Sequence, residues 1–170
     1  AWFVWDDRVS AAFVGFALAT AMLPDVDLAL RHALPVVHHG VTHTVVFVTA
    51  VSLVAGLVAE RAVGPLLERW WLQDEGKAPS AGALFSFAAG GMLTGALSHL
   101  FADMLSAPDI AKPVNPFWPL FDKPWSVDLI WYNSPWWNAG LLAAALALHL
   151  ALAYAVVAVD HPHRLRSGVE

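Results

Sequence analysis

The sequence predicts an all-α membrane protein, a polytopic bundle of about four transmembrane helices in one domain covering residues 1–170. Composition is the first indication: 58% of the residues are hydrophobic and 14% are charged, whereas soluble domains carry about 25% charged residues. The second is the mean hydropathy of +0.58, which arises from four apolar segments. The third is the position of every tryptophan outside those segments.

The four apolar segments are the predicted helices, taken in chain order. Val9–Leu23 has 15 residues and is short for a straight span, whereas Val41–Ala59 has 19. Ala81–Leu100 has 20, with its helix expected to continue to residue 105, and Ala139–Val159 has 21. At 1.5 Å per residue the last three reach about 28–31 Å, close to the hydrocarbon thickness of a bilayer. They have almost no polar stripe, which argues against four core helices of a soluble bundle.

The connections carry the polar and aromatic residues. Residues 60–80 form a predicted charged connector, and residues 106–138 form a long loop rich in tryptophan and proline. Tryptophan prefers the boundary between water and hydrocarbon, so this loop is expected to lie in the membrane interface. Within the third segment, Gly91 and Gly95 form a small-xxx-small pattern suited to close helix contact.

Aspartates and histidines are expected to meet at one end of the bundle. The first helix ends where the second begins, and the third helix returns to the same face before it ends. Each of these three ends carries residues that bind metals. They are Asp25 and Asp27 after the first helix, His38, His39 and His43 at the start of the second, and His99 and Asp103 at the end of the third.

The spacing of these residues favours a metal site. His99 and Asp103 are four apart and share a helix face. His39 and His43 have the same offset of four residues. His38 and His43 do not, so His38 would join them only if the helix begins near Gly40 and His38 lies on the loop before it. Imidazole with carboxylate suits zinc, manganese or iron, and the chain has no cysteine to favour softer metals. We expect one or two divalent ions, with zinc first, because six ligands exceed the four that one tetrahedral zinc needs.

Four motifs in order, LPDVD, HHGVTHT, SHLFAD and NPFWPLFDKPWS, resemble those of the membrane-bound metal-dependent hydrolases, also called LexA-binding, inner-membrane-associated hydrolases. The usual family pattern is L-P-D-x-D, H-R-G-x-T-H-S, a distal H-x-x-x-D and a proline-aromatic stretch. The resemblance covers residues 21–138. It implies a multi-span protein of a prokaryotic cytoplasmic membrane that holds a divalent-metal hydrolase site.

The resemblance also implies roles for individual residues. His39 stands where the family usually has arginine, a natural clamp for phosphate or carboxylate. Spacing favours His39 as a ligand and the resemblance favours His38. We predict His38 as the ligand, with His39 and Thr42 supporting the ligands or contacting substrate. The predicted metal ligands are Asp25, Asp27, His38, His43, His99 and Asp103.

The predicted activity is hydrolysis, of a phosphoester rather than an acyl bond, in a lipid-like or other amphiphilic substrate. Asp27 or Asp103 is predicted to act as the base. In the interfacial loop, Lys123 is a predicted phosphate contact, and Asn115 and Asp122 either contact substrate or form turns. The loop itself is either a lid over the site or a membrane anchor without substrate contact.

Other functions remain open at this stage. A divalent-cation transporter would bind ions near the midplane of the membrane. His149 is the only one of the candidate residues expected at that depth, and we interpret it as a structural hydrogen-bonding residue. A haem protein or a metal-binding membrane scaffold are further alternatives. The net charge of −5 gives no basic surface for nucleic acid. Six of the nine lysines and arginines lie on the opposite face, which predicts an extracytoplasmic metal face. The oligomeric state stays open.

Overall fold

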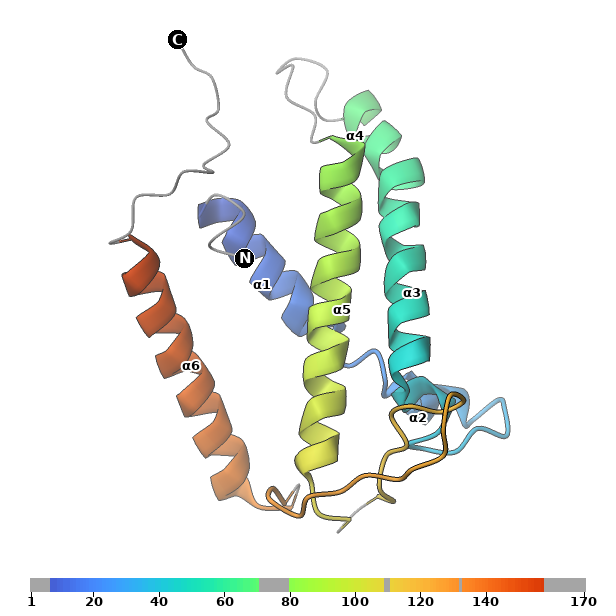
Figure 1. The fold of residues 1–170 in the computed structure, drawn as a ribbon. Helices are drawn as coiled ribbons and strands as arrows, with labels where there is room; N and C mark the ends of the chain where they lie inside the picture. Colours follow the sequence, from blue (N-terminus) through green and yellow to red (C-terminus); the bar gives the residue numbers. More distant parts are fainter. Residues whose placement is uncertain (1–6, 71–79, 109–110, 132, 158–170) are drawn as a thin grey trace.

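The protein is described by a computed structural model that covers residues 7–70, 80–108, 111–131 and 133–157. Its regular secondary structure in these residues is helical, with two isolated β-bridges in the long loop (Figure 1). The elements are α1 (Asp7–Thr20), α2 (Val26–Leu30), the 3-10 turn η1 (Val41–His43), α3 (Val45–Val58), the π-helical turn η2 (Ala59–Val63), α4 (Gly64–Trp70), α5 (Ala81–Leu105) and α6 (Pro135–Val157).

Three helical stretches are long and apolar enough to cross a membrane, namely Val45–Leu66, Ala81–Leu105 and Pro135–Ala155. A shorter apolar helix covers Val9–Thr20. The prediction of an all-α membrane bundle is confirmed, with the first helix as the short member. The third helix was predicted over residues 81–105, and α5 has these bounds.

The first two predicted helices are wrong in detail near the site. The first ends at Thr20 rather than Leu23, because Pro24 disfavours helical backbone at the preceding residue. A further short helix, α2, follows it and was not predicted. The second begins with a 3-10 turn, and α3 starts only after Thr44, whose hydroxyl accepts a hydrogen bond from Phe47 N at 3.1 Å.

Two connector boundaries also differ from the prediction. The charged connector expected from residue 60 is helical as far as Trp70, through η2 and α4, and residues 71–79 lie outside the described part. Helix α6 begins at Pro135, four residues before the predicted start at residue 139, because proline suits the first turn of a helix. Its predicted end at residue 159 lies outside the described residues, as do Trp2, Trp5 and Trp71.

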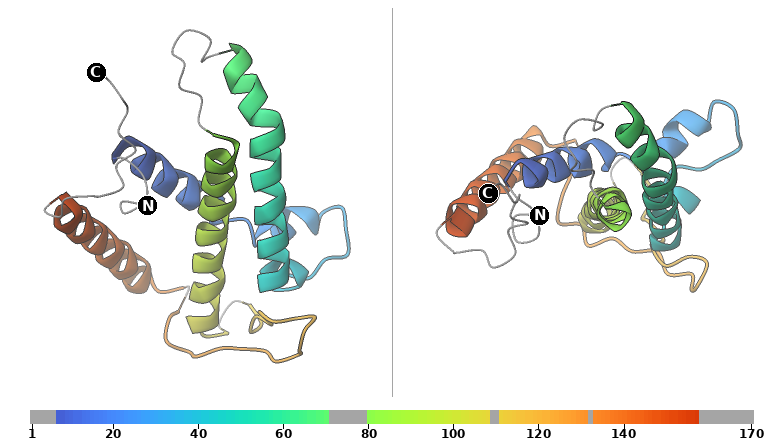
Figure 2. Two further views of the ribbon diagram at one scale, coloured as in Figure 1. Left: turned by 45° about the horizontal axis from the view of Figure 1, so that its top comes forward. Right: turned by 90° about the horizontal axis from the view of Figure 1, so that it is seen from above.

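Glycines allow α1 to pack directly on α5. A Cβ built on Gly95 would lie 2.0 Å from the carbonyl oxygen of Ala17, and one built on Gly91 would lie 2.6 Å from the ring of Phe16. The small-xxx-small pattern thus faces α1. On another side of α5, α3 packs against it along its length (Figure 1). Helix α6 stands apart from α3 and α5 (Figure 2). None of its apolar stretch that is long enough to cross a membrane is buried against the rest of the described chain.

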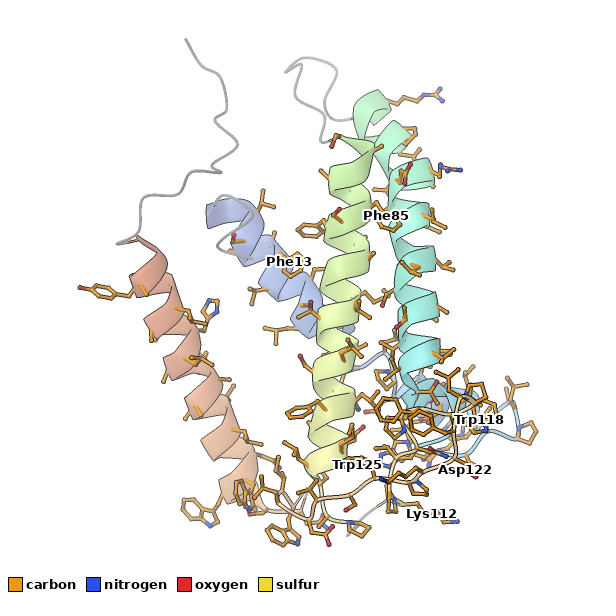
Figure 3. The ribbon with its side chains drawn as sticks, in the orientation of Figure 1. Phe13, Phe85, Lys112, Trp118, Asp122 and Trp125 are labelled. Carbon is orange, nitrogen blue, oxygen red and sulfur yellow. The ribbon has the colours of Figure 1, made fainter. Side chains whose placement is uncertain are left out.

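The long loop is tied to the ends of α3 and α5. Val45 N donates to Pro116 O at 2.8 Å, which joins the loop to the start of α3. Ala107 N donates to Ile130 O at 2.8 Å, and Val127 N donates to Met104 O at 3.0 Å. Trp118 and Trp125 therefore lie at this end of the molecule, with exposed side chains (Figure 3). Their position fits the interfacial loop that the sequence predicts.

Candidate metal centre

A fully buried histidine stands at the centre of the cluster. The exposed fraction of His43 is 0%, and its Nδ1 lies 3.2 Å from Asp27 Oδ2. Its other ring nitrogen, Nε2, lies 3.3 Å from Asp25 Oδ1 and 3.6 Å from Asp103 Oδ2. One imidazole therefore touches three carboxylates, which come from α2, the turn before it and the last turn of α5.

A tight turn before α3 brings the histidines into place. Gly40 is required there, because a Cβ would lie 2.6 Å from the carbonyl oxygen of Val37. His39 has a φ of 61°, in the left-handed region that residues other than glycine seldom adopt. Backbone strain of this kind occurs mainly where the surrounding structure fixes a functional side chain. His38, His39 and His43 consequently converge without sharing a helix, which corrects the expectation that His39 and His43 occupy one helix face.

Asp27 is held as an ionised carboxylate by its neighbours. The Nδ1 of His38 lies 3.0 Å from Oδ1, and the hydroxyl of Thr42 donates to Oδ2 at 2.9 Å. Burial by itself raises the pKa of the Asp27 carboxyl, but the hydrogen bonds from His38 and Thr42 outweigh it and leave that pKa below its ordinary value. Asp27 therefore carries a negative charge in a buried position.

His43 is held neutral. Burial lowers its pKa to about 4, and the nearby His39 adds to this effect, while Asp103 and Asp27 oppose it. A neutral imidazole has one N–H and one lone pair. The Thr42 hydroxyl donates to Asp27, so its oxygen accepts from His43 Nδ1–H at 3.1 Å. The lone pair of His43 is then on Nε2, a buried atom that has no hydrogen-bond partner among the described residues.

The surroundings of Nε2 could hold a cation. Its lone pair faces carboxylate oxygens of Asp25 and Asp103, and three electron-rich atoms so close together repel one another unless a positive charge lies between them. Protonation of His43 would supply that charge, but burial opposes it. An imidazolium at His99, whose Nε2 lies 3.3 Å from Asp103 Oδ2 and 3.6 Å from Asp25 Oδ1, would supply it from the other side, and so would a bound metal ion. A divalent ion with nitrogen and oxygen ligands suits this set of donors. The donor set therefore fits the predicted metal.

Helix α5 completes the set through its i, i+4 pair. His99 Nε2 lies 3.3 Å from Asp103 Oδ2 and 3.6 Å from Asp25 Oδ1. The donor atoms of three groups lie within 4.8 Å of one another. These groups are Asp25, His43 and His99; Asp25, Asp27 and His38; and His38, His39 and His43.

His39 lies among the donors as well as His38. Its Nδ1 hydrogen-bonds the carbonyl oxygen of Lys112 in the long loop, so the lone pair is on Nε2, 4.0 Å from Asp103 Oδ2. Metal-binding histidines are commonly oriented by such a hydrogen bond from the other ring nitrogen. His38 instead directs its Nδ1 at Asp27. The geometry therefore gives His39 at least as good a position for a metal as His38.

A family model with the description "YdjM inner membrane protein" matches residues 4–163. The chain belongs to the YdjM inner membrane protein family. No curated protein and no solved structure matches it. Membership and the three long apolar helices together establish a location in the inner membrane, with the bilayer as the surroundings of the helices. For a YdjM-family chain of this kind, a buried group of ionisable residues is a candidate functional site.

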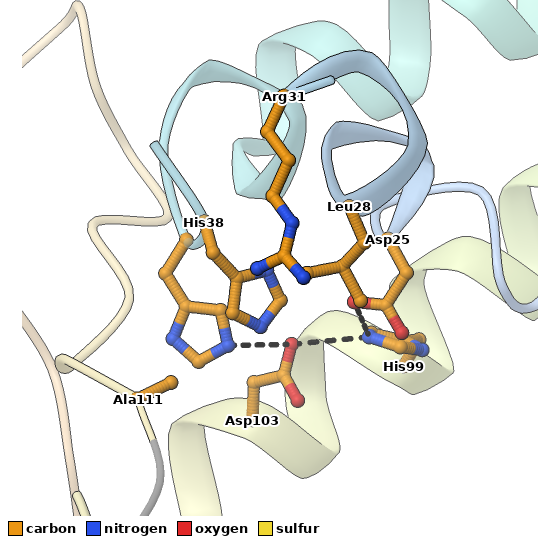
Figure 4. A pocket seen from close by; sticks show the side chains of 8 residues that line it. Asp25, Leu28, Arg31, His38, His99, Asp103 and Ala111 are labelled. Carbon is orange, nitrogen blue, oxygen red and sulfur yellow. Dashed lines mark ion pairs between the residues drawn. The ribbon is translucent and has the colours of Figure 1, made fainter. Parts of the chain in front are cut away.

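An open cavity of about 390 Å³ adjoins the cluster in this YdjM-family protein (Figure 4). Arg31 belongs to its wall and was not among the predicted site residues. Helix α2 was not predicted from the sequence, and this helix is what places Arg31 one turn after Asp27. Arg31 N donates to Asp27 O at 2.8 Å. The lining residues are Asp25, Leu28, Arg31, His38, His39, His99, Asp103 and Ala111.

Three predicted site residues of the loop do not line this cavity. The ammonium of Lys123 lies over the ring of Trp125, 5.2 Å from its centroid. Asn115 donates from Nδ2 to Asp122, and its Oδ1 accepts a hydrogen bond from Lys123 N at 3.1 Å. These contacts fit the turn role considered for Asn115 and Asp122. His149 lies on α6, outside the cluster.

Proposed function

We propose that this YdjM-family protein is an integral-membrane metal-dependent hydrolase, acting on a phosphoester rather than an acyl bond. The observation that supports it most directly is the buried Nε2 of His43, whose lone pair faces two carboxylates across a gap suited to a cation. The motif resemblance to membrane-bound hydrolases supports the same class. Zinc is the first candidate, with manganese or iron as alternatives.

The chain's own groups divide into ligands and supports. Asp25, His99 and Asp103 lie around Nε2 of His43, while Thr42 and Asp27 orient His43 from its Nδ1 side. A divalent ion bound there supplies Lewis acidity and lowers the pKa of water toward neutrality. Asp103 lines the cavity and Asp27 does not, so we assign the base role to Asp103. Asp27 already accepts hydrogen bonds on both oxygens.

Apolar side chains around the site suit an amphiphilic substrate. Leu34 and Val37 precede the histidine turn with exposed fractions of 51% and 68%. Arg61 and Arg69 lie beyond the other end of α3, and this excess of positive charge opposite the metal face supports an extracytoplasmic metal face. The long loop adds further exposed apolar side chains on the metal face. The exposed large apolar side chains of the loop are Trp118, Leu120, Phe121, Trp125, Val127, Leu129 and Trp131.

Metal analysis by mass spectrometry tests the proposal first. Protein purified in detergent without chelator should carry one or two equivalents of zinc, manganese or iron. His43→Ala and Asp103→Ala should lose the metal, and His149→Ala on α6 is the matched control that should keep it. The loaded protein should then hydrolyse phosphoesters, and the two site variants should not. Full metal content in both site variants would refute the ligand assignment, and loaded protein without turnover of phosphoesters or acyl esters would refute the hydrolase.

A further inference from the structure

Arg31 is the cationic side chain of the cavity wall. It is the C-cap residue of α2, and its neighbour on the wall, Leu28, lies one turn earlier. Figure 4 shows its guanidinium reaching across the cavity above Asp103 and beside His38. Helix α2 thus delivers a carboxylate into the cluster through Asp27 and a positive charge to the cavity through Arg31.

The guanidinium is not used by the carboxylates nearby. Among the described residues, every ion pair of the cluster joins an aspartate to a histidine, and none includes Arg31. An exposed arginine that shares a cavity wall with two aspartates, here Asp25 and Asp103, usually pairs with one of them, because a bidentate pair is favourable. Arg31 instead keeps its fork of N–H donors available to a molecule in the cavity.

We infer that Arg31 binds a phosphoryl group in this cavity and so sets the substrate class of the site. A phosphoryl group has enough oxygens to face the His/Asp cluster and the guanidinium together, whereas a carboxylate has only two. Arginine presents a planar fork that matches phosphate oxygens. The cavity of about 390 Å³ falls within the range of about 300–1,000 Å³ for small-molecule sites.

The inference rests on the proposed metal site. Asp25, Asp27 and Asp103 outweigh the single guanidinium, so an anion binds only after a divalent ion has offset these carboxylates. Leu30 and Leu34, which flank Arg31 in sequence, have exposed fractions of 36% and 51% and offer apolar surface to the rest of an amphiphile. The same phosphoryl chemistry belongs to a lipid headgroup and to a soluble phosphoester.

Phosphate affinity in variants of Arg31 tests the inference. Inorganic phosphate is titrated calorimetrically into manganese-loaded protein in detergent, and bound metal is measured in each sample. Arg31→Gln should weaken phosphate binding about 10- to 100-fold at unchanged metal content, because one charge-assisted contact is lost. Arg31→Lys should give an intermediate affinity, since it keeps the charge and loses the fork. Arg61→Gln removes the same charge at the opposite end of α3 and should change nothing.

Equal phosphate affinity in wild type and Arg31→Gln would overturn the inference, and so would a loss of metal in Arg31→Gln. A second arm adds nanodiscs that contain phosphatidate or only phosphatidylcholine. Competition by phosphatidate alone identifies a lipid headgroup as the source, and its absence identifies a soluble phosphoester. Arg31-dependent phosphate binding without turnover would refute the hydrolase and retain the site. Turnover together with phosphate binding that does not depend on Arg31 would refute the role of Arg31 and retain the hydrolase.

Discussion

Gly95→Ala is predicted to disturb the metal centre from a position outside it. The added Cβ would lie 2.0 Å from Ala17 O, 3.0 Å from Ala17 C and 3.1 Å from Ala21 N. These are backbone atoms, so no side-chain rotation relieves the clash. To bring the closest contact from 2.0 Å to 3.0 Å, α1 and α5 must separate locally by about 1 Å.

This shift is transmitted to the ligands, because Ala21 lies only four residues before Asp25. Metal ligands need their positions within about 0.5 Å. We therefore expect a loss of metal affinity of about 10- to 100-fold, the range seen when groups that orient ligands are removed. Overpacking should also lower the free energy of unfolding by about 1–3 kcal/mol.

The assay is competition with a chromophoric chelator in detergent, together with thermal unfolding of the metal-free protein. Gly90→Ala is the matched control: it lies on the same helix, and its Cβ would meet only the ring of Phe13 at 3.7 Å, an ordinary contact. Wild-type metal affinity and stability in Gly95→Ala would refute the argument that α1 positions Asp25 through this contact. Equal losses in both variants would show an unspecific effect of alanine.

Two further predictions concern the buried polar groups. Lowering the pH from 6.5 to 4 should destabilise the metal-free protein by about 2.5 kcal/mol, because the pKa of His43 falls from 6.5 to about 4 on folding and the unfolded state binds more protons than the folded state throughout this range. The lowered pKa of Asp27 acts in the same direction at still lower pH. Thr42→Val should cost about 1.5–3 kcal/mol in the free energy of unfolding, because the carboxylate of Asp27 loses a buried donor.

Thermal unfolding at several pH values and denaturant titration measure these two effects. His43→Gln should remove most of the destabilisation between pH 6.5 and 4, and an unchanged pH dependence in that variant would contradict the assignment to His43. Thr42→Ser keeps the hydroxyl and should retain most of the stability. If Thr42→Ser is as unstable as Thr42→Val, the loss comes from packing of the methyl group rather than from the hydrogen bond.

The sequence predicted the membrane helices well where hydrophobicity alone decides them. Helix α5 has no competing signal over its 25 residues, and its bounds agree with the prediction. Around the site the prediction was weaker, because α2 has only 5 residues and too few apolar positions to show a period. Without α2, the sequence offered no reason to place Arg31 beside Asp27. The turn at His39 was also hidden, since a left-handed φ at histidine has no sequence signature.

The loop shows the same division. Its aromatic and proline content predicted an interfacial position, which needs only composition. Its contacts were not predictable, because they depend on which backbone groups the ends of α3 and α5 leave available. Val45 N and Met104 O take partners in the loop, and the carbonyl of Lys112 meets His39. Lys123, a predicted phosphate contact, lies over the ring of Trp125.

By itself the sequence determined the membrane class, the helix that carries His99 and Asp103, and the chemical type of the candidate site, because hydropathy and the i, i+4 spacing act locally along the chain. Only the tertiary structure decided that His43 is buried and neutral with its lone pair toward two carboxylates. It alone placed Arg31 over the cavity. The physical reason is that burial, and with it the pKa and the cost of an unpaired charge, depends on residues that are distant in sequence.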